Sequence, residues 1–251
     1  MTAHEYLVNI LNNQKMQQVE LNTLQHLRSQ IEASLRLDHG TAPRFYYGGS
    51  YGKNTLIRAA YDLDIVMYFP STDYRSLGDL FRAVHQSLIK ANYTVTAKNV
   101  ALRLPYDGGF HIDVVPGKAQ DTTFQYATLY KSEENSTRQT SIKVHIDTVR
   151  NSGAREIIKL MKLWRLRNNL SWQSFALEQT VIRALDGKSK NDYGSCVLTV
   201  LQFIRDNILT IRLVDPANTN NIIEMSPAIR QQLRSYAANS ASAANWNQIV
   251  Y

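Results

Sequence analysis

Two aspartates one residue apart, Asp62 and Asp64, are the residues of this sequence best suited to do chemistry. They belong to the apolar run DLDIVMYF, which reads as a β-strand, and alternate residues of a strand project from the same face. Their Cα atoms would then lie about 6.6 Å apart. Two like charges this close favour a cation between them, and Mg²⁺ takes carboxylate and phosphate oxygens together. The pair therefore predicts half of a metal site that a nucleotide would complete.

A third carboxylate, Asp113, lies in the strand-like segment FHIDVV between Ile112 and Val114. We expect this strand to lie beside that of Asp64, which would assemble a cluster of three aspartates. Such a cluster suits two divalent ions, one activating a hydroxyl nucleophile and one holding a triphosphate. A solvated strand edge is the simpler interpretation of an isolated Asp-x-Asp, but unpaired charge is costly inside apolar runs. We expect His111, on the same face as Asp113, to be an ordinary hydrogen-bonded histidine.

The turn GGS precedes the aspartate pair and follows a short strand-like segment, RFYY. Glycine lets the backbone approach a phosphate closely, and a serine at a helix start adds a hydroxyl beside free N–H groups. We expect Gly49 and Ser50 to bind the triphosphate, with Lys53 and Arg58 adding positive charge. The segment is not a P-loop, because no Gly-Lys-Ser/Thr follows, and by itself it is also compatible with an ordinary turn.

Taken together, GGS, eleven residues, DLD and the later HIDVV resemble the signature of the DNA polymerase β-type nucleotidyltransferase superfamily. Members join a nucleoside monophosphate to a hydroxyl and release pyrophosphate. The resemblance implies that Gly49 and Ser50 bind nucleotide, that Asp62, Asp64 and Asp113 are the catalytic and metal-binding carboxylates, and that two Mg²⁺ or Mn²⁺ ions are the cofactors. All three acidic positions are filled, which favours an active enzyme.

The second half of the chain narrows the resemblance to particular families within this superfamily. REIIKLMKLWR places Arg155, Lys159 and Lys162 on one face of a helix. With the later SFALEQTVIRAL and VDPANTNN, it is similar to the second domain of the 2′-5′-oligoadenylate synthetases and the bacterial cyclic-oligonucleotide synthases, or CD-NTases. That similarity implies that Lys162 and Ser174 contact the triphosphate. Phe175 stands where those families commonly have tyrosine, so a ring-hydroxyl contact would be absent.

The elements that must position these residues fall into two groups. Helical spacing covers residues 2–37 as one long helix or two abutting ones, and short strands with one helix follow as far as residue 130. A turn at YDGG predicts an antiparallel hairpin, whereas YKSEENSTRQTS and VDPANTNN are expected to be loops. We therefore predict a bilobal α+β protein with a polymerase β-like core. Its catalytic lobe, a mixed sheet with flanking helices, covers residues 1–152, a helical lobe covers 153–251, and the nucleotide binds between them.

Composition limits the partners. The net charge of +7 and the pI of about 9.4 favour polyanions: nucleotides, nucleic acid or an acidic membrane surface. A single cysteine, Cys196, allows no disulfide framework or thiolate metal site within the chain. The N-terminus does not resemble a signal peptide and no apolar run is long enough to span a bilayer, so we expect a cytoplasmic protein without a membrane partner. A nucleic acid, a ligand or a regulatory protein on the basic face remains open, as does the oligomeric state.

The hydroxyl acceptor is the least determined part of the reaction. By resemblance, the first hypothesis is a second nucleotide, giving a cyclic or linear oligonucleotide messenger for anti-phage signalling. A template-independent RNA-tailing enzyme of the CCA-adding or poly(A) type is the first alternative. A catalytically silent toxin–antitoxin or binding module on the same fold is the second. Base choice, 2′-5′ or 3′-5′ linkage, ring closure and the activating signal are not determined by the sequence.

Overall fold

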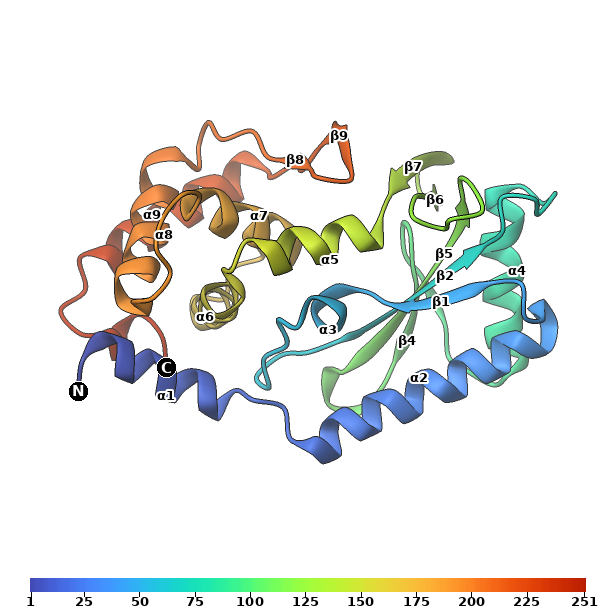
Figure 1. Cartoon of the computed structure of the whole chain (residues 1–251), viewed down its shortest axis with the longest axis horizontal. Coiled ribbons are helices and arrows are strands. Elements are labelled where there is room, and N and C mark those ends of the chain that lie inside the picture. Colours follow the sequence, from blue (N-terminus) through green and yellow to red (C-terminus); the bar gives the residue numbers. More distant parts are fainter. The chain divides into compact units, whose positions relative to one another are not determined.

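The computed structural model describes residues 1–251 and divides the chain into two compact units (Figure 1). The sheet unit contains Met16–Asn54 and Ala60–Ile146. The helical unit contains Asp147–Tyr251 together with two earlier segments, Met1–Lys15 and Thr55–Ala59. The chain thus passes between the units several times, which differs from the two consecutive lobes, 1–152 and 153–251, that the sequence predicts.

A mixed seven-stranded sheet forms the centre of the sheet unit, in the order β1-β2-β5-β4-β3, with β6 pairing β5 and β7 pairing β6. The strands are β1 (Arg44–Tyr47), β2 (Leu63–Phe69), β3 (Thr96–Ala97), β4 (Leu102–Pro105), β5 (His111–Ala119), β6 (Ala127–Lys131) and β7 (Ser136–Thr140). Strands β2 and β5 are parallel neighbours, and every other pair in the sheet is antiparallel. This arrangement confirms the predicted mixed sheet and the predicted hairpin, in which β4 returns as β5.

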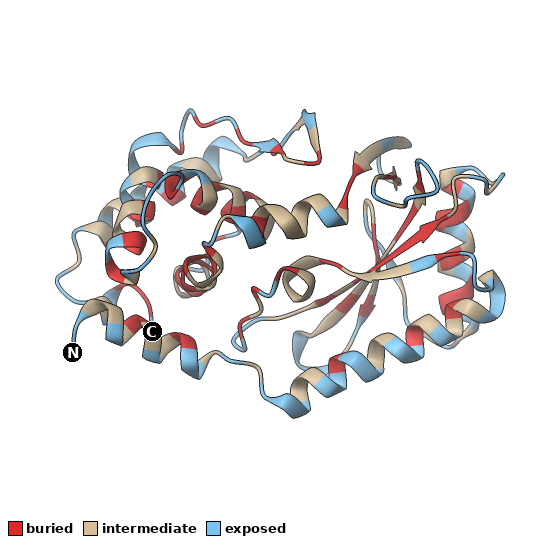
Figure 2. Cartoon of the chain, viewed as in Figure 1, coloured by how far each residue is buried: buried red, intermediate tan, exposed pale blue.

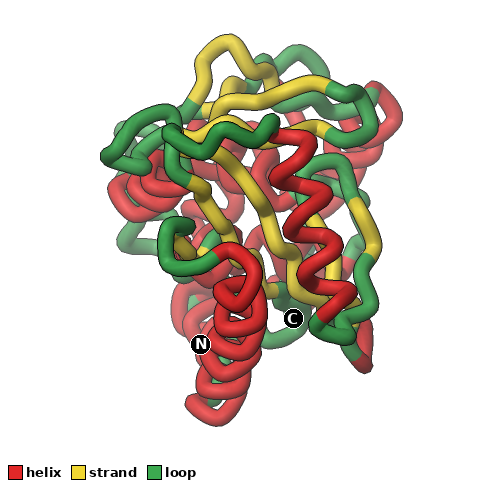
Figure 3. Tube along the Cα trace, turned by 90° about the vertical axis from the view of Figure 1, so that its right-hand side faces the viewer, coloured by secondary structure: helices red, strands yellow, loops and turns green.

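Three helices belong to the sheet unit: α2 (Gln18–His39), α3 (Gly49–Lys53) and α4 (Leu77–Lys90). Helix α4 packs against α2, β5 and β6 (Figures 1 and 3). The His39 ring of α2 meets the Phe69 ring of β2 edge-on. Most of β2 is buried (Figure 2), and its odd-numbered residues are fully so. Even-numbered Val66 and Tyr68 join a second apolar cluster on the other face, the face that also carries Asp64.

The helical unit contains α1 (Ala3–Asn13), α6 (Arg155–Arg167), α7 (Ser174–Ala184), α8 (Tyr193–Asn207) and α9 (Pro227–Ala241), and α5 (Ile142–Asn151) crosses the boundary between the units. Trp164 is fully buried at its centre, edge-on to Trp172, and donates its indole N–H to Ser240. Helix α1 buries Leu7 and Leu11 in the same core, which explains why the first residues belong to this unit.

Two polar segments predicted as loops form strands instead. Ser136–Thr140 is β7, and VDPANTNN supplies most of a small hairpin, β8 (Val214–Asp215) with β9 (Asn218–Ile222). Neither segment shows the alternation of apolar residues by which strands are recognised, because neither has one face buried in a core. None of the helices is both long and apolar enough to cross a membrane.

Candidate active site

Two of the three predicted carboxylates occupy adjacent positions in the sheet. In the parallel pairing of β2 with β5, Asp64 lies directly opposite Asp113, and neighbouring strands are about 4.8 Å apart. Asp62 precedes β2, which begins at Leu63. The prediction that Asp62 and Asp64 extend from one strand was therefore wrong for Asp62. The Asp62 side chain is more open than that of Asp113, 42% exposed against 15%.

The glycine turn lies directly against Asp64. The Gly48 amide donates to the Asp64 carbonyl at 2.8 Å, and Gly49 has a positive φ of 47°. A Cβ atom at Gly49 would lie only 1.6 Å from Asp64 Oδ2. Only glycine satisfies both the backbone conformation and the close approach. The glycine turn and the Asp64 carboxylate, which are separate in the sequence, are thus packed directly against each other. Ser50 follows in the first turn of α3.

A basic side chain that sequence reasoning did not select contacts the carboxylate cluster. Arg103 on β4 is the register partner of Asp113, and its Nε and Nη2 atoms donate to Asp113 Oδ1 and Oδ2 at 2.9 and 2.8 Å. These hydrogen bonds raise the pKa of Arg103, and the charges of Asp113, Asp62 and Asp64 raise it further. The available signal was the hairpin itself, since a YDGG turn pairs a basic residue of one strand with the aspartate of the next.

His111 lies between two of the aspartates. Its Nε2 atom is 3.8 Å from Asp62 Oδ2 and 3.8 Å from Asp113 Oδ2, beyond hydrogen-bonding distance. That buried nitrogen has no hydrogen-bond partner. The expectation of an ordinary, satisfied histidine is therefore wrong for Nε2, and a polar atom in need of a partner faces the carboxylate cluster.

The chemistry of the donors fits a hard divalent cation, although no preformed cage is present. Carboxylate oxygens are the ligands that Mg²⁺ selects, and Asp62 and Asp113 both border the unpartnered His111 nitrogen. Even so, no three Asp, Glu, His or Cys side chains converge as a ready metal site. Both oxygens of Asp113 instead accept hydrogen bonds from the guanidinium of Arg103.

Lys162 and Ser174, the other two predicted nucleotide-binding residues, belong to the helical unit. Lys162 is buried, and its Nζ atom lies 3.1 Å from both oxygens of Thr55 and 3.7 Å from Glu178 Oε1. The Ser174 hydroxyl, at the start of α7, accepts a hydrogen bond from Arg165. These contacts attach the Thr55–Ala59 segment to α6 and α7. Binding of phosphate by either residue stays a prediction.

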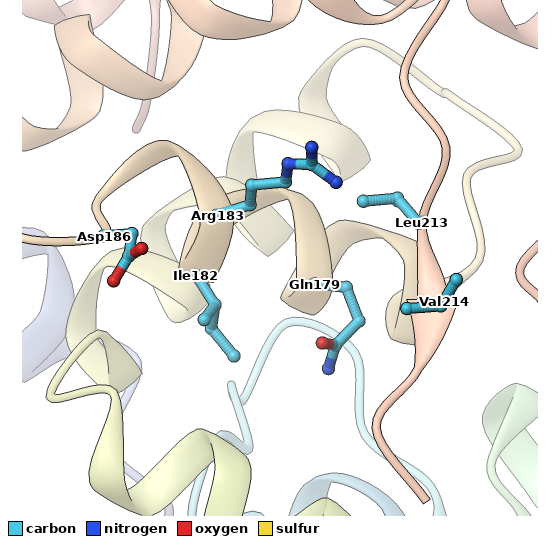
Figure 4. Close-up of a pocket in the computed structure, with 6 residues that line it drawn as sticks. All are labelled: Gln179, Ile182, Arg183, Asp186, Leu213 and Val214. Carbon is cyan, nitrogen blue, oxygen red and sulfur yellow. The ribbon is translucent and has the colours of Figure 1, made fainter. Parts of the chain in front are cut away.

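A cavity of about 330 Å³ opens in the helical unit between α7, with the turn that follows it, and the start of β8 (Figure 4). The side chains of Gln179, Arg183 and Asp186 line one side, and Leu213 and Val214 line the other. None of the residues predicted to bind nucleotide or metal lines it, although Gln179, Arg183 and Val214 belong to the motifs that carry the family resemblance.

Comparison with known proteins agrees with this geometry. The model of the family described as "Second Messenger Oligonucleotide or Dinucleotide Synthetase domain" matches residues 1–152. The chain is 26% identical over 209 residues to the cyclic AMP-AMP-AMP synthase of Escherichia coli strain MS 115-1, an alignment that covers 75% of this chain and 65% of that protein. The chain thus spans about two thirds of that relative's length.

Solved structures share the fold. The Vibrio cholerae cyclic AMP-GMP synthase DncV superposes with a TM-score of 0.77 at 17% identity, covering 98% of this chain and 93% of that one. CdnC of E. coli MS115-1, solved as a CdnC:HORMA-deltaN complex, gives a TM-score of 0.73 at 17% identity, covering 95% and 89%. With Asp64 and Asp113 on paired strands and a glycine turn against Asp64, the chain has the polymerase β-like nucleotidyltransferase fold and belongs to the Second Messenger Oligonucleotide or Dinucleotide Synthetase family, among the CD-NTases.

Proposed function

We propose that this protein is a metal-dependent nucleotidyltransferase that joins nucleoside triphosphates into a cyclic or linear oligonucleotide messenger and releases pyrophosphate. The observation that carries the proposal is the register of Asp64 opposite Asp113, with Gly49 closed against the Asp64 carboxylate. A structural role alone would not require carboxylates on adjacent central strands, where their mutual repulsion is costly.

The residues divide the work by position. Asp62, Asp64 and Asp113 would hold Mg²⁺ or Mn²⁺, which lowers the pKa of an attacking hydroxyl and offsets charge on the phosphates. The Gly49–Ser50 turn, fixed against Asp64, would orient the triphosphate relative to the carboxylates. Orientation of this kind contributes several kcal/mol to catalysis, roughly 7–11 in well-aligned intramolecular reactions. Contacts from Lys162 and Ser174 to the phosphates, and the presence of two ions, are parts of the proposal that rest on family resemblance.

A second nucleotide is the acceptor that we favour. The named products of the relatives, cyclic AMP-AMP-AMP and cyclic AMP-GMP, support this choice over RNA. RNA tailing is the alternative to be tested beside it. A role in anti-phage signalling and a cytoplasmic location are further predictions. Because the E. coli relative was solved with a HORMA protein, a regulatory protein partner is also part of the proposal.

One incubation tests the activity and separates the alternatives. The purified chain is mixed with Mg²⁺ or Mn²⁺ and the four NTPs, with and without RNA, and the products are resolved by mass spectrometry. Oligonucleotides from NTPs alone support the messenger synthase, whereas products that need RNA indicate tailing. Asp64→Asn should lower turnover at least 100-fold, a typical loss when a group that stabilises the transition state is removed. Asp121→Asn, which removes an exposed carboxylate elsewhere in the sheet unit, is the matched control. No pyrophosphate release under any condition would refute the catalytic proposal.

A further inference from the structure

Arg103 holds Asp113 in a defined orientation. Each oxygen of the carboxylate accepts one N–H from the guanidinium, at 2.9 and 2.8 Å, which is the planar, two-point geometry that arginine alone provides. The backbone enforces the pairing, because β4 and β5 place the two residues directly opposite each other. Asp113 is 15% exposed and Arg103 36% exposed, so the pair is partly shielded from water.

The same guanidinium offsets negative charge that belongs to the whole cluster. Asp64 is the register neighbour of Asp113 on the other side of β5, and Asp62 reaches the same region through His111. Carboxylates gathered in this way repel one another unless a cation is present. Arg103 stays protonated at any pH at which the protein is folded, so its charge is a constant feature of the cluster.

We propose that Arg103 is a positioning residue with two separable effects: its charge weakens the binding of a divalent cation to the aspartates when no nucleotide is present, and its fork orients Asp113. A cation at Asp113 must either displace the guanidinium or lie beside a like charge, and both raise the free energy of the loaded state. The metal would therefore bind together with a nucleotide, whose phosphates add negative charge, rather than alone. The inference rests on the metal site of the proposed function, and its orienting effect rests also on the proposed activity.

Two substitutions separate the effect of the Arg103 charge from that of its two-point hydrogen bonding. Arg103→Gln removes both, whereas Arg103→Lys keeps the charge and loses the two-point geometry. Mn²⁺ binding to the nucleotide-free protein is measured by electron paramagnetic resonance. Arg103→Gln should bind Mn²⁺ on the order of tenfold more tightly than the wild type, because the positive charge beside the aspartates is removed. Arg103→Lys should stay within about twofold of the wild type.

Arg82→Gln is the matched control, since Arg82 is an exposed arginine of the same unit, paired with Asp79 on α4. It removes one positive charge that does not contact the three aspartates, and it should leave Mn²⁺ binding unchanged. At saturating Mn²⁺, both Arg103 variants should show a kcat at least tenfold below the wild type, the effect of a misoriented group. Tighter metal binding with slower turnover is a combination that general damage to the fold does not produce.

The metal titration needs no turnover, so its result does not depend on the proposed catalytic activity. Mn²⁺ binding by Arg103→Gln that is unchanged, weaker or undetectable overturns the inference. If Arg103→Gln does not fold in EDTA, Mn²⁺ should restore its circular dichroism spectrum, and failure to do so also overturns the inference. Absence of product with every NTP would refute the enzyme and leave the Mn²⁺ result to decide the role of Arg103.

Discussion

Substituting Gly49 by alanine tests whether the glycine turn positions Asp64 or only connects two elements. The φ of 47° at Gly49 disfavours any residue with a Cβ, at a cost of about 1–2 kcal/mol. The added methyl would lie 1.6 Å from Asp64 Oδ2 and 2.6 Å from its Cγ, but 3.3 Å from its Cβ. The clash therefore concerns the carboxylate group and not the backbone of β2.

Rotation of the Asp64 side chain about χ1 relieves this overlap without moving the strand. We therefore expect a modest loss of stability and a large loss of activity. A loss of about 1–2 kcal/mol lowers Tm by roughly 2–8 °C for a protein of this size. Moving a catalytic carboxylate by an ångström or more should lower kcat about 100-fold. The two measurements are a thermal unfolding curve and the rate of pyrophosphate release.

Gly108→Ala is the control, because Gly108 also has a positive φ, 71°, and no atom lies within 4 Å of a Cβ placed there. It should lower Tm by as much as Gly49→Ala and leave the rate near that of the wild type. Equal rates for the two variants would refute the reasoning, as would a Gly49→Ala protein whose rate is lost only because it is unfolded.

Three further predictions concern the rest of the fold. Glu178→Ala should lower the free energy of unfolding by about 3 kcal/mol in urea titrations, because the buried Lys162 would keep its charge without that carboxylate. The double variant Glu178→Met/Lys162→Met should lose less, which would confirm that the unpaired charge is the cause. Burial, with a contribution from the charge of Arg75, lowers the pKa of His39, so its neutral form is favoured in the folded state. The contribution of His39 to the free energy of unfolding should be complete above the unfolded-state pKa of about 6.5 and should be lost as the pH falls through the lower folded-state pKa. His39→Gln should flatten this decline of stability with falling pH, and an unchanged decline would contradict the role of His39. Arg230→Met should cost about 1–3 kcal/mol, since its guanidinium donates to three carbonyls after α8; an unaltered urea midpoint would show that water replaces those bonds at no cost.

The most predictable parts of this protein were those that local chemistry specifies. The start of α9 is an example, because Ser226 accepts a hydrogen bond from the Ile229 amide and Pro227 takes the first position of the helix. Apolar alternation located β5, and the YDGG turn located its hairpin with β4. The less predictable elements, β7 and the β8–β9 hairpin, are polar strands whose existence depends on partners elsewhere in the chain.

For the site, the sequence by itself determined which groups are present: three aspartates in apolar surroundings, and a glycine turn ahead of them. Only the tertiary structure decided how they meet, because the register of β2 against β5 is fixed when the buried faces of two strands distant in sequence pack into one core. It placed Asp64 opposite Asp113, left Asp62 outside the strand, closed Gly49 onto a carboxylate and brought Arg103 to Asp113. The first two of these follow from pairing between strands that lie some fifty residues apart, and the last two from contacts that form only once the sheet has assembled.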